Sequence, residues 1–113
     1  MSKREPDNLL QDILQSAENI LTYTRGITYD DFVSNQMMID AVIRNFEIIG
    51  EAANRLPNEY KDQCPQIDWF KIRGLRNRIV HNYFGIDYDI IWLTKENYLP
   101  ELISDVQDLL KKL

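Results

Sequence analysis

Apolar residues recur every three or four positions along nearly all of this 113-residue chain, and this helical period constrains the fold more than any other feature. No useful length of the chain alternates apolar and polar residues with the period of two that a half-buried strand requires. The pattern therefore predicts an assembly of amphipathic helices. A chain of 113 residues suits one domain, and we expect residues 1–113 to form it.

Two long helices are predicted in the first half of the chain, one that stops before Gly26 and one that runs from about residue 34 to residue 56. Pro57 ends the second, and the segment 28–35, TYDDFVSN, can add a short helical turn between them. The apolar arc of the second helix covers more than half of its circumference, which normally requires two packing partners. This width also gives the chain a reason to dimerise.

Two further helices are expected in the second half. The third covers roughly residues 68–83 and is closed by Gly85, and the fourth begins near Asp87 or Asp89. Pro100 lies inside the fourth helix, but the apolar phase is the same before and after it, which favours a kink over a break. The expected fold is therefore all-α, a four-helix up-and-down bundle whose fourth helix is kinked at Pro100.

Composition excludes several classes of protein. The first residues are polar, with no apolar segment behind them that would make a signal peptide, and no stretch approaches the roughly 18 apolar residues of a membrane span. We therefore expect a cytoplasmic protein that does not contact membranes. The only cysteine, Cys64, has no partner for an internal disulfide, and with a single histidine the chain has too few ligands for a zinc site. No metal and no cofactor are expected.

The positive charge of the chain is concentrated in one segment. The net charge of −5 argues against a broad nucleic-acid-binding surface, which is usually basic. Between Lys71 and Ile86, however, there are four Lys or Arg residues and no acid, against nine basic and eighteen acidic residues elsewhere. Such a patch could hold one or a few phosphates. The alternative is a solvated helix face whose charge is balanced by acids elsewhere.

The segment 73–87, RGLRNRIVHNYFGID, places polar groups on the apolar side of the third helix. At about 100° per residue, Arg76 and Tyr83 lie within roughly 20° of each other, inside the apolar arc. An unpaired guanidinium buried there would cost several kcal/mol, so Arg76 must meet a carboxylate, reach an edge or line a cleft. His81 lies about 140° from Arg76 on the same wheel, so the two meet only if the helix frays before Gly85 or if two chains pair.

Taken singly, these residues have simpler explanations. A lone histidine near a helix C-terminus commonly stabilises the helix dipole, and a tyrosine in an apolar arc commonly belongs to the core. Asn77, Arg73 and Arg78 would then be ordinary surface residues. The combination favours function: an arginine followed by a polar residue, a histidine after a gap of four, and a tyrosine two positions later, just before a glycine-containing turn.

The stretch RNRIVHNYFGID resembles the signature of the HEPN superfamily, and specifically of its HepT-like (DUF86) branch. The flanking segments DWFKIRGLRNRIVHNYFGIDYDIIW, FEIIGEAANRLP and YLPELISDV are also similar to that family, so that the resemblance covers nearly the whole chain. It implies a toxin of a toxin–antitoxin system, a metal-independent endoribonuclease that dimerises with its motifs facing a shared cleft. The implied partners are RNA and a nucleotidyltransferase antitoxin of the MNT type.

Position by position, the resemblance implies that Arg76 and His81 form the catalytic pair and that Asn77 is the polar residue of the motif. Tyr83 is the tyrosine that the antitoxin would modify with AMP. Arg73 and Arg78 are weaker candidates for binding substrate phosphate, and metal ligands are absent from the motif. Glu47 and Glu51 lie in a segment similar to the family's, and the helical wheel places them opposite the main apolar stripe of their helix.

The residue types suit metal-independent cleavage of RNA. The reaction requires a base for the ribose 2′-hydroxyl, an acid for the leaving oxygen and a cation for the charge that develops on the phosphate. Histidine serves the first two roles and arginine the third, and a dimer would supply two histidines. The alternative is a non-catalytic helical subunit of a nucleotidyltransferase, in which Arg76 and His81 would grip a nucleotide phosphate without turnover.

Overall fold

The computed structural model of the chain describes residues 4–81 and 85–113, and the side chain of His81 is outside this description. The helices of this part of the chain are α1 (Pro6–Thr24), α2 (Tyr29–Val33), α3 (Gln36–Arg55), α4 (Asn58–Lys61), α5 (Trp69–Ile79), α6 (Tyr88–Asn97) and α7 (Leu99–Lys112). Two short strands, β1 (Val80–His81) and β2 (Gly85–Ile86), pair in antiparallel fashion between α5 and α6.

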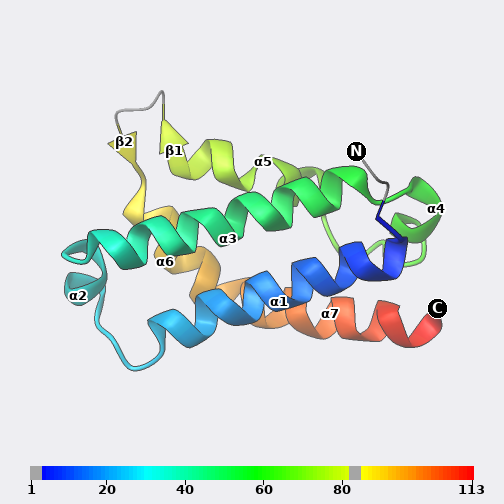
Figure 1. Ribbon diagram of the computed structural model, residues 1–113, viewed down its shortest axis with the longest axis horizontal. Coiled ribbons are helices and arrows are strands. Elements are labelled where there is room, and N and C mark those ends of the chain that lie inside the picture. The colour runs from blue at the N-terminus through cyan, green and yellow to red at the C-terminus, as the bar shows by residue number, and fades with distance from the viewer. Residues whose placement is uncertain (1–3, 82–84) are drawn as a thin grey trace.

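The long helices run alternately in opposite directions. Figure 1 shows α1 and α5 running one way along the long axis, and α3 and the pair α6 and α7 running the other way. The all-α, up-and-down bundle predicted from the helical period is therefore confirmed. The expected helical turn between the first two long helices is also present as α2, and Gly26, which follows α1, has a φ of 76° in the left-handed region.

The wide apolar arc of α3 is covered within one chain. α3 packs against α1 on one side and against α5 on the other, while α1 also contacts α7. The residues that α3 buries include Ile39, Val42, Phe46, Ile49 and Ala53. The prediction of two packing partners for this helix is thus confirmed, but both partners belong to the same chain. The arc therefore gives no separate reason to dimerise, and the homodimer stays a prediction.

The third predicted helix is shorter than the sequence pattern indicated. It ends at Ile79 rather than near Tyr83, because Val80 is extended (φ −108°, ψ 115°) and pairs with Ile86 in β2. Gly85 is part of β2 and does not close the helix. The end of α5 is instead tied to the start of α6, since the backbone N–H of Asp87 donates to the carbonyl of Ile79 at 2.7 Å.

The kink expected at Pro100 is present as a junction between α6 and α7. Tyr98 separates the two helices, and Pro100 lies in the first turn of α7, where its missing N–H costs no helical hydrogen bond. Tyr98 keeps a right-handed helical conformation. Its N–H donates to the carbonyl of Thr94, and its own carbonyl accepts from the N–H of Leu102, each at 2.9 Å. The helical path therefore bends without losing its phase.

Candidate functional site

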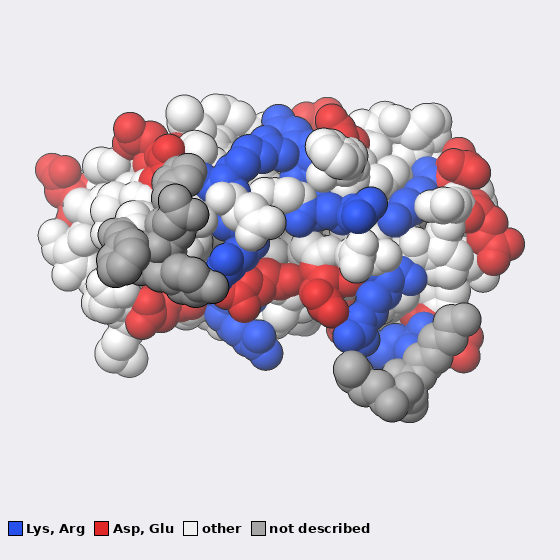
Figure 2. All heavy atoms as spheres, turned by 90° about the horizontal axis from the view of Figure 1, so that it is seen from above, with Lys and Arg blue, Asp and Glu red and all other residues white. Residues whose placement is uncertain are grey.

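A hollow of about 690 Å³ lies between α3 and α5. α5 contributes Arg73, Arg76 and Arg78 to its lining, and α3 contributes Glu47 and Glu51. One wall is therefore basic and the other acidic. Figure 2 shows the basic side chains gathered in the middle of this face, with acidic side chains beside them.

The two walls are held close by the packing of α3 against α5. At Gly50 a Cβ atom would lie 3.5 Å from the backbone oxygen of Arg73, so that α3 reaches the main chain of α5 at this point. The start of α5 is fixed by Asp68, whose side chain accepts a hydrogen bond of 2.9 Å from the N–H of Lys71. A rigid helix therefore presents the three arginines to the hollow.

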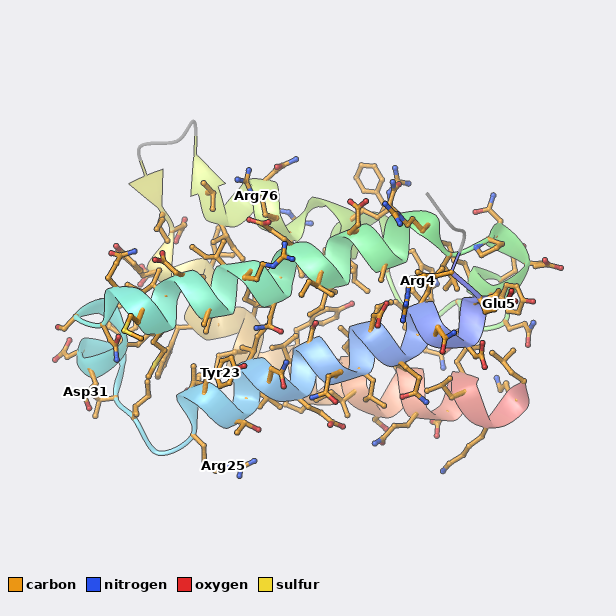
Figure 3. The ribbon with its side chains drawn as sticks, viewed as in Figure 1. Arg4, Glu5, Tyr23, Arg25, Asp31 and Arg76 are labelled. Carbon is orange, nitrogen blue, oxygen red and sulfur yellow. The ribbon has the colours of Figure 1, made fainter. Side chains whose placement is uncertain are left out.

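Arg76 forms an ion pair across the hollow. Its Nε lies 3.6 Å from Oε1 of Glu47, and the side chains of Arg76 and Glu47 are 41% and 39% exposed. Figure 3 shows Arg76 on α5, close to the ribbon of α3. Of the arrangements that the helical wheel allowed for Arg76, the structure combines two, because the guanidinium both meets a carboxylate and lines a cleft. About two fifths of the Arg76 side chain remains open to solvent and to a ligand.

Glu51, the second acid of the hollow, is engaged with its own helix. Its Oε1 lies 3.0 Å from Nη2 of Arg55, one turn further along α3. Glu47 also approaches Arg44, with 4.0 Å between Nη1 and Oε2. Each carboxylate on the α3 wall is thus near at least one guanidinium, which reduces the repulsion that an incoming phosphate would meet.

Arg73 and Arg78 differ in how they are held. Nη2 of Arg78 donates a hydrogen bond of 2.9 Å to the carbonyl of Lys71, so its side chain runs back along the surface of α5. Arg73 is exposed and has no ion-pair partner within residues 4–81 and 85–113. The guanidinium of Arg73 is therefore the most available cation of this wall.

The remaining residues of the motif are placed only in part. Asn77 is exposed on α5 and does not contribute to the lining of the hollow. The main chain of His81 pairs with Gly85, which places the histidine beyond the end of the helix. The angle of about 140° on a continuous helical wheel therefore does not describe the relation between Arg76 and His81. Tyr83 lies outside the described residues.

The sequence patterns did not single out two features of the hollow. Phe70 is 83% exposed and lies among the lining residues, and Gly74 opens the surface of α5 beside it. Phe70 could have been found from the sequence, because it is a large aromatic residue that lies outside the apolar arc of its helix. The contact of Glu47 with Arg76 depends on how α3 and α5 cross, which the helical wheel of a single helix does not contain.

The fold and the hollow define a class: an all-α bundle that presents a cluster of arginines between two of its helices. The family model described as Ribonuclease HepT-like matches residues 13–109, and the chain belongs to this family. The resemblance inferred from the motif is thereby confirmed.

Several relatives are similar to the chain over almost their full length. A protein of Methanocaldococcus jannaschii named "Putative RNase" is 40% identical, over 95% of this chain and 98% of its own. A protein with the same description from Caldanaerobacter subterraneus subsp. tengcongensis is 38% identical, over 96% of this chain and 97% of its own. A "Probable ribonuclease HepT" from Thermococcus cleftensis is 37% identical, over 96% of this chain and 99% of its own. No solved structure matches the chain.

Two further observations concern the described residues alone. No helix among them is long and apolar enough to cross a membrane. They contain no group of three or more His, Cys, Asp or Glu side chains arranged to hold a metal ion.

Proposed function

We propose that this chain is a metal-independent endoribonuclease and the toxin of a toxin–antitoxin system, acting in the cytoplasm on RNA. The observation that carries the proposal is Arg76, a half-exposed guanidinium that faces a hollow of nucleotide size on a rigid helix. Membership of the Ribonuclease HepT-like family supports it, as do relatives whose names describe them as RNases.

In the proposed reaction the 2′-hydroxyl of a ribose attacks the adjacent phosphorus, and the bond from phosphorus to the 5′-oxygen of the next nucleotide breaks. His81 accepts the proton of the 2′-hydroxyl, and a protonated histidine donates a proton to the leaving 5′-oxygen. Arg76 binds the phosphate oxygens, on which negative charge builds up. The products are a 2′,3′-cyclic phosphate and a 5′-hydroxyl, which balances the atoms and protons.

A homodimer would supply the second histidine, because each chain carries only one. One copy of His81 would then act as base and the other as acid across a shared groove. Sedimentation equilibrium tests the assembly. A monomer at micromolar concentration would contradict the dimer. A mechanism that uses one histidine would then remain, and the cleavage assay described below would test it.

The proposed partner is an MNT-type nucleotidyltransferase antitoxin that uses ATP. The phenolic oxygen of Tyr83 would attack the α-phosphorus of ATP, pyrophosphate would leave, and the phenolic proton would be lost. The added phosphate would bring negative charge to the motif and would compete with RNA for its arginines. Incubation with the partner and ATP, followed by intact-mass measurement, should show an AMP adduct on the wild type and none on Tyr83→Phe.

The decisive experiment measures cleavage of labelled RNA in the presence of EDTA. His81→Ala and Arg76→Ala should each abolish cleavage while their circular dichroism spectra stay helical. Arg25→Ala is the matched control, because Arg25 is an exposed arginine at the end of α1, and it should cleave like the wild type. A 2′-deoxy substitution at the cleaved nucleotide should block the reaction.

Full cleavage by His81→Ala would exclude the proposed mechanism. Loss of cleavage in EDTA that a divalent metal restores would exclude its metal independence. The alternative function is a non-catalytic subunit that holds a nucleotidyltransferase. It predicts partner binding without any turnover of RNA by the wild type.

A further inference from the structure

Phe70 stands out among the exposed apolar residues because of its surroundings. Its side chain is 83% exposed on α5, yet it lies in the lining of a hollow whose other members are mostly charged. Single exposed apolar side chains are common and need no explanation by themselves. An exposed ring among guanidinium groups is a different arrangement, because it offers an apolar face and cations to the same ligand.

Two guanidinium groups of α5 flank Phe70 around the circumference of the helix, Arg73 about 60° to one side and Arg78 about 80° to the other, although both follow Phe70 in the chain. Arg73 is three positions further on, which places it one helical turn away on the same side of the helix. Arg78 is eight positions further on, but its Nη2 reaches back to the carbonyl of Lys71, the residue next to Phe70. The charged end of Arg78 is thereby drawn toward the ring, and its other N–H groups remain free to donate.

Gly74 keeps the surface between these groups open. A Cβ atom at this position would meet only Nη2 of Arg78, at 3.8 Å, so helix packing does not demand a glycine here. Glycine within a helix costs about 1 kcal/mol relative to alanine. Because Gly74 has no side chain, the surface between Phe70 and Arg78 is open, and ligand atoms can approach the backbone of α5 closely there.

We propose that Phe70 is a stacking platform for one unpaired base of single-stranded RNA, and that Arg73 and Arg78 bind the phosphates on either side of that base. This inference rests on the proposed ribonuclease function and adds a determinant of substrate binding to it. Phe70 and Arg76 are six positions apart, or about 9 Å along the helix axis. The stacked base therefore belongs to a nucleotide next to, or one removed from, the phosphate that Arg76 holds.

The lining of the hollow favours RNA over a protein partner. The buried centres of protein interfaces are depleted in charged residues, whereas this hollow has three arginines and two glutamates around one aromatic ring. An aromatic ring together with cations is the usual combination in grooves that bind single-stranded nucleic acid. The volume of about 690 Å³ also lies within the roughly 300–1,000 Å³ of small-ligand pockets.

Binding is measured in the His81→Ala background, so that the RNA stays intact. The probes are short oligoadenylates, each with 2-aminopurine at one position, whose fluorescence falls when the base stacks. We expect Phe70→Leu to weaken binding about five- to 150-fold and to abolish the quenching at one position of the probe. Phe70→Trp keeps a ring and should restore both. Met37→Ala is the control, because Met37 is equally exposed (84%) but lies on α3 outside the lining of the hollow.

An abasic nucleotide at the quenched position completes the test. If the base stacks on Phe70, removing the base should weaken binding to the His81→Ala protein and leave binding to the His81→Ala, Phe70→Leu double variant unchanged. Equal binding of the intact probe by these two proteins would overturn the inference. A weaker complex that accompanies a change from dimer to monomer would also overturn it, since Phe70 would then contact a second copy of the chain.

The outcomes separate this inference from the proposed function. Cleavage by His81→Ala would refute the catalytic mechanism, whatever Phe70 does. Loss of cleavage in His81→Ala, together with RNA binding that does not depend on Phe70, would leave the ribonuclease proposal intact and refute the stacking platform.

Discussion

At the scale of single residues, the contact between Glu47 and Arg76 joins the two walls of the hollow. Both side chains are about half exposed, so the pair itself contributes little to stability. Its effect on the orientation of Arg76 is more important, because a guanidinium binds phosphate best when its fork faces the oxygens.

For Glu47→Gln we expect tighter binding of RNA but a lower kcat. The substitution removes a negative charge from the hollow, and it also removes the partner that orients Arg76. The free energy of unfolding should change by less than about 1 kcal/mol. Glu51→Gln is the matched control, because it makes the same change in charge on a carboxylate that pairs with Arg55 instead. If both variants lower kcat equally, Glu47 has no specific role in positioning Arg76.

Tyr98, at the junction of α6 and α7, carries a buried hydroxyl. Among the described residues this oxygen has no hydrogen-bond partner, and burial raises the pKa of Tyr98 to about 12. The ring also lies 5.4 Å from Nζ of Lys71, a contact that phenylalanine would keep. We expect Tyr98→Phe to raise the free energy of unfolding by about 1 kcal/mol at pH 7, since it removes an unpaired polar group.

The pH dependence gives a second check on Tyr98. The pKa in the folded state lies above the ordinary value of 10.0, so the folded state holds the phenolic proton more tightly than the unfolded state does. The free energy of unfolding of the wild type should therefore be constant below pH 10 as far as Tyr98 is concerned, and should fall as the pH rises toward 12. The phenylalanine variant lacks that loss, and its advantage should therefore grow between pH 10 and pH 12 in urea unfolding. A less stable variant at pH 7 would indicate a bound water on the hydroxyl.

At the scale of secondary-structure elements, Asp87 fixes the start of α6. Its side chain accepts a hydrogen bond of 3.1 Å from the N–H of Ile90, while its own N–H holds the end of α5. Asp87→Ala should lower the free energy of unfolding by about 1 kcal/mol through loss of the cap, and Asp87→Asn should stay near the wild type. Urea unfolding measures both, and an equal loss in the two variants would point to the charge of Asp87 instead.

The sequence predicted the helices well because their apolar period is a local property. It predicted the position of Arg76 in the apolar arc, and Asp87 as a start of the last helical segment. The end of α5 could not be read from the period, since the apolar phase continues past Ile79 while the backbone leaves the helix. What ends the helix is pairing with residues 85–87, a contact that depends on tertiary structure.

The ion pair of Arg76 likewise depends on tertiary structure and could not be predicted from the helical period. The wheel required a partner or a cleft for this guanidinium but could not choose Glu47, because that choice depends on the close crossing of α3 and α5 at Gly50. His81, by contrast, was placed on the wrong kind of element, a helix instead of a strand. The roles of His81, Asn77 and Tyr83 stay predictions.

At the scale of the whole molecule, charge is distributed unevenly. The net charge is −5, yet three arginines line one hollow. RNA binding should therefore depend on salt only moderately. For single strands the slope of log K against log salt is about −0.7 for each phosphate neutralised, which predicts about −2 for one hollow and about −4 if two copies share a groove.

Titration of RNA binding against salt tests this prediction. Arg73→Ala should make the slope shallower by about 0.7, while Lys111→Ala, on the last turn of α7, should leave it unchanged. A slope much steeper than −4 would indicate a broad electrostatic surface that the acidic chain does not display.

The pairing of β1 with β2 between α5 and α6 has a consequence for the length of the connection that joins the two strands. The ends of this connection are held by two residue pairs of β1 and β2 and by the bond of 2.7 Å from Asp87 to Ile79. Since these contacts hold the two ends of the connection together, the cost of lengthening it is mainly the added entropy of closure, which is about 0.6 kcal/mol for each doubling of loop length. Residues inserted between His81 and Gly85 should accordingly be tolerated by the fold, while Arg76 keeps its place on α5.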